Sequence, residues 1–509
     1  MVRYSSFILL SVFTVLGFAL RIFHIDFQSL WIDELLVILK AEQKSLLEII
    51  EASKVDVHPP LYDYLIHFWI YFGKTAATLR FFSLIFGVGS IPVIYLVGKK
   101  IYDEKVGLTA AFILTIWPFS IWYSQEVRPY TLIFFLGLLS IGFFLEGIET
   151  NSWKYWTNFI ILTTLCLYTN HATLYLIFVF NIFIIISWLN KKHLDIFNRW
   201  IIVQIIIIFL YIPGLYILVS QLLWQKNSKT PEMLFIRQPG FTTIPYLFYN
   251  LTFYADALPL RWLRGIMLIP IIIVFFSGLK PFKNTFKGIK SFIFEGKNLF
   301  LILCLFLPIT ISFILGVFAK KEFMYDARYF MIFMPAYLIL LSRGILQINH
   351  KSAQKFLITF CLISVFAANY RIYTIPINPP VKEVVKYIKD RYLPGDIVFM
   401  HRSTWKIVFD YYSNNRIVTE GVLNNYDPKY GVFPYEFTQV TENYIPILQE
   451  KLKGYSRLWI VLTPHEVRRD PKEIVVRYLD NHFENKLKKK IYPEYFEILM
   501  YDLRAKKKV

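Results

Sequence analysis

Two neighbouring carboxylates, Asp33 and Glu34, lie in a polar stretch, residues 24–62, that directly follows the first apolar segment. A carboxylate can take a proton from a hydroxyl or an amine as that group attacks, so the pair is a candidate general base. From Leu35 to Ile50 the segment is amphipathic, with leucines and isoleucines at helical spacing. In the alternative interpretation, Asp33 is therefore the N-cap of a helix and Glu34 favours its positive N-terminus. The two roles are compatible if the pair divides them.

A rigid turn closes the same stretch. His58 is followed by Pro59 and Pro60, and then by Leu61 and Tyr62. The two prolines fix the backbone and prevent a helix from starting before Leu61. In one interpretation the turn presents His58 to an anion or a metal ion. In the other it is only a rigid entry turn with a solvated histidine.

Two arginines stand at the entrances of apolar segments farther along the chain. Arg128 precedes Tyr130 by two residues, and Arg328 directly precedes Tyr329. A guanidinium can bind a phosphate through two parallel N–H donors, so both arginines are candidate phosphate ligands. The alternatives are a surface ion pair with Glu126 for the first, and a snorkelling arginine beside an interfacial tyrosine for the second.

The rest of the chain predicts a membrane scaffold. Of its 509 residues 56% are hydrophobic, and they lie in blocks long enough to cross a bilayer. We expect a polytopic α-helical membrane protein with about eleven to thirteen transmembrane helices. The predicted spans are 5–22, 80–98, 107–123, 129–146, 156–169, 172–189, 200–220, 263–279, 298–318, 329–346 and 356–372.

Charge predicts the orientation. The net charge of +19 would favour nucleic acid in a soluble protein, but here lysines and arginines gather in alternate connections between spans, as at Lys99, Lys100 and Arg343. We therefore expect a cytoplasmic N-terminus, no nucleic-acid partner, and contact with membrane lipids. The polar stretch, both arginine turns and a turn ending at His171 then face outward. Groups suited to phosphate chemistry meet there, as a lipid-anchored substrate requires.

The composition changes after about residue 372. Helical spacing in 380–393 and strand patterns in 397–400, 457–463 and 495–503 predict a soluble α/β domain over residues 373–509, on the outer side. Residues 1–372 form the predicted membrane domain, with 24–79 as its first outer loop. The three cysteines all lie in apolar segments and show neither metal-ligand spacing nor the pattern of a disulfide framework.

Several motifs together carry a family resemblance. They are WIDE (31–34), HPPLY (58–62), RFFSLIFG (80–87), SQEVRPY (124–130), YTNH (168–171) and ARYF (327–330). In this order and spacing they resemble the GT-C membrane glycosyltransferases, in the family 39-like group of protein O-mannosyltransferases and the lipid A aminoarabinose transferase. The resemblance covers roughly residues 1–372. The large lumenal domain of the protein mannosyltransferases is lacking, which argues against that particular activity.

The resemblance implies inverting transfer of one sugar from a polyprenyl-phosphate donor to an acceptor outside the cytoplasm, which is a lipid, a glycan or a protein. It makes Asp33 the general base, with Glu34 placing the acceptor or an ion. The implied substrate-binding residues are His58, Tyr62, Arg128, Tyr130, His171, Arg328 and Tyr329. Some members bind a divalent cation and others need none, and no ligand set in this sequence decides between them.

Two other classes of protein compete with this interpretation. A transporter or flippase for a lipid-linked sugar would need charged residues near the middle of its spans and paired repeats, and the sequence shows neither. A receptor that binds through its C-terminal domain would leave the many spans and the polar first loop unexplained. The sugar, the acceptor and the type of polyprenyl chain do not follow from the sequence.

Overall fold

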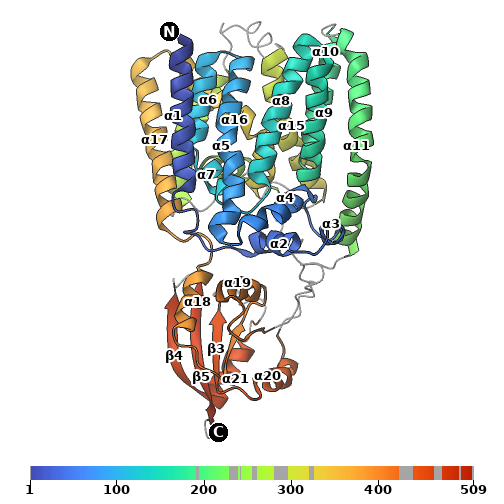
Figure 1. Ribbon diagram of the computed structural model, residues 1–509. Helices are drawn as coiled ribbons and strands as arrows, with labels where there is room; N and C mark the ends of the chain where they lie inside the picture. The colour runs from blue at the N-terminus through green and yellow to red at the C-terminus, as the bar shows by residue number, and fades with distance from the viewer. Residues whose placement is uncertain are drawn as a thin grey trace. The chain divides into compact units, whose positions relative to one another are not determined.

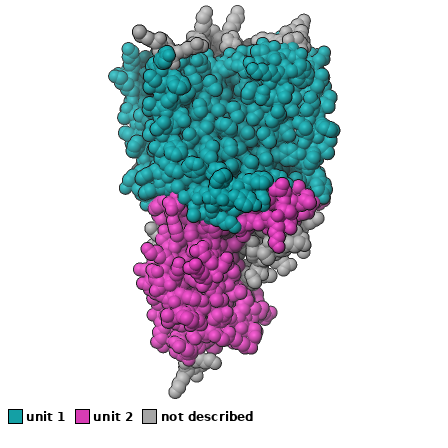
Figure 2. Space-filling model, viewed as in Figure 1, with its two compact units in different colours: residues 1–25, 56–221, 233–375 teal, residues 26–55, 222–232, 376–509 magenta. Residues whose placement is uncertain are grey.

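The computed structural model describes residues 2–190, 194–227, 239–240, 242–254, 261–279, 296–319, 326–422, 440–463, 470, 473–491 and 495–506. The chain forms two compact units, coloured separately in Figure 2. The first comprises residues 1–25, 56–221 and 233–375. The second comprises 26–55, 222–232 and 376–509. The second unit therefore combines a piece of the predicted first outer loop with the C-terminal region.

The first unit is a bundle of apolar helices that run alongside one another (Figure 1). Seven described helical stretches are long and apolar enough to cross a membrane. They comprise α1 (Val2–Ile22), α5 (Ala76–Ile101), α8 (Tyr130–Thr150), α11 (Leu194–Asn227), α15 (Gly296–Ala319), η3 with α16 (Ala327–Phe333 and Met334–Gln347) and α17 (Lys351–Thr374).

Four further predicted spans correspond to shorter or bent helices. The pair α6 (Glu104–Ile116) and α7 (Pro118–Ser124) is bent by 58° and counts as an eighth span if taken together. The others are α9 (Trp153–Thr169), α10 (Thr173–Leu189) and α13 (Arg261–Gly278). Each of the eleven predicted segments thus falls on a helix or on a bent pair, and the predicted fold class is confirmed.

The bend between α6 and α7 has a local cause. Pro118 has no N–H, so it cannot donate to the carbonyl of Leu114 as the next turn of a helix would require. Trp117, between the two helices, has an extended backbone with ψ of 117°. α7 therefore starts in a new direction and ends at Ser124, just before the predicted Arg128 turn.

Close packing holds α5 against α6. Gly107 lies so near α5 that a Cβ at this position would come within 2.5 Å of the Tyr95 carbonyl oxygen. Any larger residue would have to push the two helices apart, because the obstacle is backbone. This contact fixes the position of α6 and hence of the α7 segment that follows.

The predicted first outer loop, residues 24–79, is helical over much of its length. It contains α2 (Ile32–Ala41), α3 (Leu46–Ser53), α4 (Leu61–Trp69) and the short η1 (Ile70–Phe72). The amphipathic segment predicted from Leu35 to Ile50 is thus two helices. Ser45 caps the second, because its side chain accepts a hydrogen bond from the Glu48 N–H.

Residues 28–30 bind to the C-terminal part of the second unit through hydrogen bonds. The Gln28 side chain accepts from the N–H groups of Ile377 and Asn378, at 2.8 and 3.2 Å. The Leu30 N–H donates to the Tyr412 hydroxyl at 2.7 Å. These bonds explain why residues 26–55, which contain α2 and α3, belong to the same compact unit as residues 376–509.

A five-stranded mixed sheet, in the order β2-β1-β3-β5-β4, forms the centre of the second unit. Its strands are β1 (Asp396–Met400), β2 (Thr419–Gly421), β3 (Arg457–Leu462), β4 (Phe483–Ile491) and β5 (Phe496–Lys506). The described helices are α18 (Val381–Lys389), α19 (Thr404–Ser413), η4 (Glu442–Tyr444), α20 (Ile445–Leu452) and α21 (Ile474–His482). β1 pairs in parallel with β2 and β3, and β5 pairs antiparallel with β3 and β4.

A buried ion pair joins the first residues of β1 and β3. Arg457 donates to both carboxylate oxygens of Asp396, at 2.7 and 2.6 Å, and Trp459 donates to the same group at 2.9 Å. Burial alone would raise the pKa of Asp396, but these hydrogen bonds and the one from the Leu393 N–H lower it. The carboxylate is therefore ionised at neutral pH.

Candidate functional site

Tyr130 is the centre of a buried cluster in the first unit. Its side chain is fully buried at the first residue of α8. The guanidinium carbon of Arg128 lies 5.6 Å from the centre of its ring, and that of Arg328 lies 5.7 Å from it. Arg128 Nη2 is also 3.4 Å from the Tyr130 hydroxyl. The two predicted phosphate ligands, 200 residues apart in the chain, thus contact one ring.

His58 and Tyr329 complete this cluster. The His58 ring stands edge-on to Tyr130 at 5.8 Å and lies 6.0 Å from the Tyr329 ring. Its Nε2 atom is 3.4 Å from the Tyr130 hydroxyl. His58 is 4% exposed, so it is not the solvated histidine of the alternative interpretation. The structure therefore brings five of the nine predicted site residues together.

An ion pair holds Arg328 in place. The carboxylate of Asp326 lies 2.5 Å from Arg328 Nε and also accepts from the Arg328 backbone N–H at 3.1 Å. Asp326 was not predicted. Its spacing from the arginine, two residues earlier, was a usable signal, because an aspartate just before a 3-10 helix is a common cap.

Tyr62 supports the backbone of the Arg128 turn. Its hydroxyl lies 2.7 Å from Ser83 Oγ on α5, and Ser83 Oγ lies 3.4 Å from the Arg128 carbonyl oxygen. Tyr62 is 2% exposed. It is thus connected to the cluster through Ser83 and the main chain of Arg128.

His171 is linked to the cluster through Gln221, near the end of α11. The Gln221 Nε2 donates to the His58 carbonyl oxygen at 3.0 Å, and its Oε1 lies 2.6 Å from His171 Nε2. Burial lowers the pKa of His171, against smaller opposing effects of Gln221 and Asp56, so its imidazole is neutral at pH 7. Gln221 carried no signal in the sequence, because a lone glutamine in an apolar helix has no motif.

A second set of hydrogen bonds holds α7 against the end of α1. Arg21, 0% exposed, donates to the hydroxyl groups of Ser120 and Ser124 on α7, at 3.0 and 3.1 Å. Gln125 Nε2 donates to the carbonyl oxygens of Arg21 and Phe23, both at 2.8 Å. These contacts fix the segment that leads into the Arg128 turn.

The two predicted catalytic carboxylates lie on α2 in the second unit. Glu34 is 0% exposed, and its Oε2 accepts from the Trp31 N–H at 3.3 Å, so Glu34 satisfies the helix N-terminus. Asp33 is half-buried in the first turn of a helix that already begins at Ile32. The alternative that made Asp33 the N-cap is therefore wrong, because the N-cap position belongs to Trp31.

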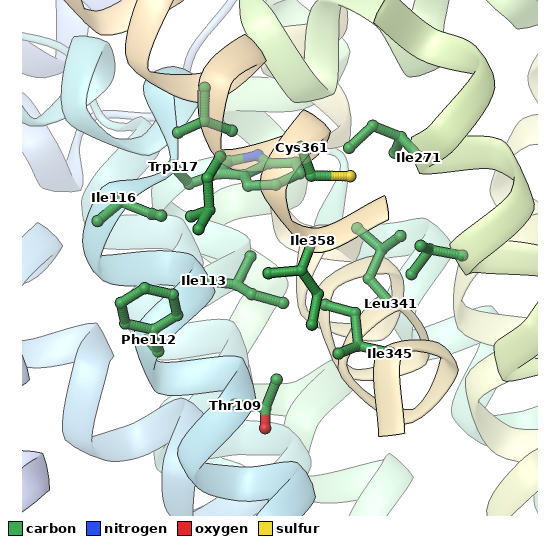
Figure 3. Close-up of a pocket in the computed structure, with 13 residues that line it drawn as sticks. Thr109, Phe112, Ile113, Ile116, Trp117, Ile271, Leu341, Ile345, Ile358 and Cys361 are labelled. Carbon is green, nitrogen blue, oxygen red and sulfur yellow. The ribbon is translucent and has the colours of Figure 1, made fainter. Parts of the chain in front are cut away.

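An apolar pocket of about 200 Å³ lies elsewhere in the first unit, between α6, α13, α16 and α17 (Figure 3). Trp117 and Cys361 are among its lining residues, and none of the predicted site residues is. Such a lining suits hydrocarbon and offers nothing to a phosphate. Among the described residues no group of three or more histidine, cysteine, aspartate or glutamate side chains is placed to hold a metal ion.

Comparison with known proteins agrees with the motifs. The model of the family described as dolichyl-phosphate-mannose-protein mannosyltransferase matches residues 57–227, about a third of the chain. This range contains His58, Arg128, Tyr130 and His171. No curated protein matches the sequence.

The fold is similar to three solved structures. ArnT from Cupriavidus metallidurans in the apo state has a TM-score of 0.59 at 10% identity, over 100% of both chains. The same protein bound to undecaprenyl phosphate gives 0.56 at 10% identity, over 97% of each chain. The Archaeoglobus fulgidus oligosaccharyltransferase, in complex with Zn and sulfate, gives 0.50 at 12% identity. The match covers 86% of this chain and 64% of that chain, so this chain spans less than two thirds of the oligosaccharyltransferase.

The predicted resemblance to the GT-C glycosyltransferases is therefore confirmed, by the family model over residues 57–227 and by the fold over the whole chain. The protein is an integral membrane protein with several apolar spans.

Proposed function

We propose that this protein is an inverting glycosyltransferase that moves one sugar from a polyprenyl-phosphate donor to an acceptor outside the cytoplasm. The acceptor is a lipid, a glycan or a protein. The observation that carries the proposal is the placement of Arg128 and Arg328 around the buried ring of Tyr130, with His58 beside it. The family match over residues 57–227 includes three of these four residues.

The two arginines suit the charge that develops in this reaction. As the bond between the sugar and the phosphate breaks, the departing polyprenyl phosphate gains negative charge. Preorganised cations in a site that excludes water stabilise such charge far better than water does. Both guanidinium groups are preorganised here. Arg328 is paired with Asp326, and the backbone carbonyl of Arg128 accepts a hydrogen bond from Ser83.

Asp33 is our candidate for the general base. Its neighbour Glu34 accepts a hydrogen bond from the Trp31 N–H at the N-terminus of α2, which supports a division of the two roles within the pair. A base that deprotonates the acceptor allows a single displacement, which inverts the configuration at the sugar and needs no covalent enzyme intermediate.

The proposal also includes the orientation in the membrane that the charges predict. The N-terminus is cytoplasmic, and the cluster and the second unit face the outside.

The neighbouring structures support a lipid-phosphate donor in this proposal. One of them was solved with undecaprenyl phosphate, the kind of product that the reaction would release. Another was solved with Zn, which keeps a divalent cation open as a cofactor.

The test uses purified protein in lipid nanodiscs, a panel of polyprenyl-phosphate monosaccharides, and a crude membrane extract as acceptor. Release of free polyprenyl phosphate is followed for the wild type and for Asp33→Asn, with Asp26→Asn as the matched control, because Asp26 is exposed in the same segment. Asp33→Asn should abolish release and Asp26→Asn should not. Full activity of Asp33→Asn would overturn the assignment of the base.

The same assay tests the phosphate site. Arg128→Gln and Arg328→Gln should each lower turnover by about 10²–10³-fold, the usual effect of removing one stabilising donor. The exposed Arg416→Gln is the control. Movement of an intact sugar lipid across the membrane without release would favour the transporter instead.

A further inference from the structure

β1 and β3 are neighbouring parallel strands, and the order of the strands reverses between them. From β1 the chain passes to β2 on one side, and then returns to β3 on the other side of β1. In open sheets with parallel strands, ligands bind outside the carboxyl ends of the strands at such a switch point. The topology therefore favours this edge as a ligand site in the second unit.

Three buried polar atoms at this edge have no hydrogen-bond partner within the described part of the chain: His401 Nδ1, Thr404 Oγ1 and Thr463 Oγ1. His401 directly follows β1, Thr463 directly follows β3, and Thr404 is the first residue of α19. The His401 side chain is 9% exposed and Thr404 is 5% exposed. Buried polar atoms without partners are destabilising, so three at one edge indicate a group that supplies the missing hydrogen bonds.

The strand register brings these residues together. Met400 pairs with Val461, and the His401 N–H donates to the Val461 carbonyl oxygen at 3.0 Å. The residues that follow the two strands are therefore neighbours across the ladder. Thr463 lies next to the loop of residues 401–403 that leads into α19.

The charges at this edge favour an anion. α19 begins at Thr404, at this same edge of the sheet. A helix N-terminus carries partial positive charge. Arg402 in the same loop adds a full positive charge, with its guanidinium 6.0 Å from the Trp405 ring.

Among the residues that the structure describes, the carboxylate in contact with His401 is that of Asp470, and it is already engaged. Asp470 Oδ2 lies 3.6 Å from His401 Nε2, and the carboxylate accepts from the N–H groups of Ile474 and Val475, at 2.7 and 3.2 Å. Burial alone would raise the pKa of Asp470, but these three partners lower it. Asp470 thus orients the imidazole by its Nε2 side and leaves the Nδ1 side for another group.

We propose that this edge of the second unit binds a phosphate monoester. The hydroxyl groups of Thr404 and Thr463 donate to phosphate oxygens, and the positive end of α19 and Arg402 offset the charge. His401 Nδ1 donates as an imidazolium, or accepts from a protonated phosphate oxygen as a neutral ring. The site is distinct from the residues proposed for the transfer reaction and does not depend on that proposal.

Calorimetric titration of the full-length protein in uncharged phosphatidylcholine nanodiscs tests this site. The probes are inorganic phosphate and glucose 1-phosphate, with glucose as the neutral comparison. Thr404→Val and Thr463→Val remove one hydroxyl each at nearly constant size. Thr404→Ser restores the hydroxyl at the first position. Two controls are Thr441→Val, at an exposed threonine, and the double variant Lys489→Gln/Lys490→Gln on the exposed edge strand β4.

Both phosphates should bind the wild type and glucose should not. Each Thr→Val variant should bind about tenfold more weakly, which corresponds to about 1.4 kcal/mol. Thr404→Ser and both controls should bind like the wild type. Equal loss in the lysine variant would mean nonspecific attraction, and unchanged binding by both Thr→Val variants, binding of glucose alone, or no binding at millimolar concentration would overturn the proposal. The readout is binding, so its failure is distinct from a failure of the proposed transfer reaction.

Discussion

Replacing Arg21 by methionine should destabilise the membrane bundle. Arg21 lies in the last turn of α1, is 0% exposed, and holds α7 through two serine hydroxyls. Its Nη1 also donates to the Thr115 carbonyl oxygen at 3.0 Å, and its Nη2 donates to that of Leu114 at 2.9 Å. Methionine fills similar space and donates nothing.

The expected magnitude follows from the two carbonyl groups at the end of α6. Pro118 removes the helical donor of Leu114, whose oxygen otherwise receives only the Trp117 N–H at 3.4 Å. Leaving a buried acceptor without a partner costs about 1–3 kcal/mol. This cost applies in full to the Thr115 oxygen and only in part to the Leu114 oxygen, which keeps the long bond from the Trp117 N–H, so together they cost about 1–5 kcal/mol. Removing the guanidinium also removes the penalty for burying its charge, which offsets part of this loss. We therefore expect a net destabilisation of about 1–4 kcal/mol.

The assay is reversible unfolding in mixed micelles with increasing denaturing detergent, followed by tryptophan fluorescence. Arg21→Lys should be intermediate, because one ammonium cannot reach both carbonyl groups and both serines at once. Arg416→Met, at an exposed arginine, is the control and should be neutral. A free energy of unfolding for Arg21→Met that equals or exceeds that of the wild type would refute the reasoning, since the loss of the Thr115 hydrogen bond alone is expected to cost about 1 kcal/mol or more.

Two further predictions concern other parts of the chain. Gln221→Leu should lower release of polyprenyl phosphate about tenfold, because it removes the hydrogen bonds that hold His58 and His171; unchanged donor kinetics in the release assay would contradict this. Because the pKa of Asp396 is lowered in the folded state, its contribution is present at neutral pH and is lost as the pH falls below about 4. The acid unfolding of Asp396→Asn, followed by circular dichroism, should therefore depend less on pH in this range than that of the wild type; parallel curves would show that the pair with Arg457 is not responsible.

The helices of the membrane bundle could be predicted from the sequence because their signal is local. A long run of apolar residues, such as that of α8 or α15, predicts a membrane-spanning helix by its length and hydropathy alone, without knowledge of its neighbours. The strands of the second unit were harder. β1, β3 and β5 are apolar and were found. β4 was missed because, as an edge strand, it carries exposed lysines and has apolar residues only at every fourth position.

The site was predictable in part for a related reason. Arg128, Arg328 and His58 stand in polar turns between apolar segments, where a charged or titratable residue is conspicuous. Gln221 and Arg21 stand within or at the end of apolar helices and act on main-chain carbonyl groups. Their partners are set by tertiary packing, which no local pattern records. The same holds for residues 28–30, whose hydrogen bonds reach Ile377 and Tyr412.

A tyrosine at the centre of the cluster has a physical consequence for anion binding. A carboxylate between two arginines would occupy their in-plane N–H donors and neutralise their charge. The ring of Tyr130 is uncharged and contacts both guanidinium groups, so it does not neutralise the positive charge that attracts a phosphate. Asp326 pairs with Arg328 at Nε and also accepts a hydrogen bond from the Arg328 backbone N–H, so it fixes the orientation of that guanidinium. Replacing Tyr130 by leucine should thus affect donor binding more than stability, whereas replacing Asp326 by asparagine should loosen the one arginine that it orients.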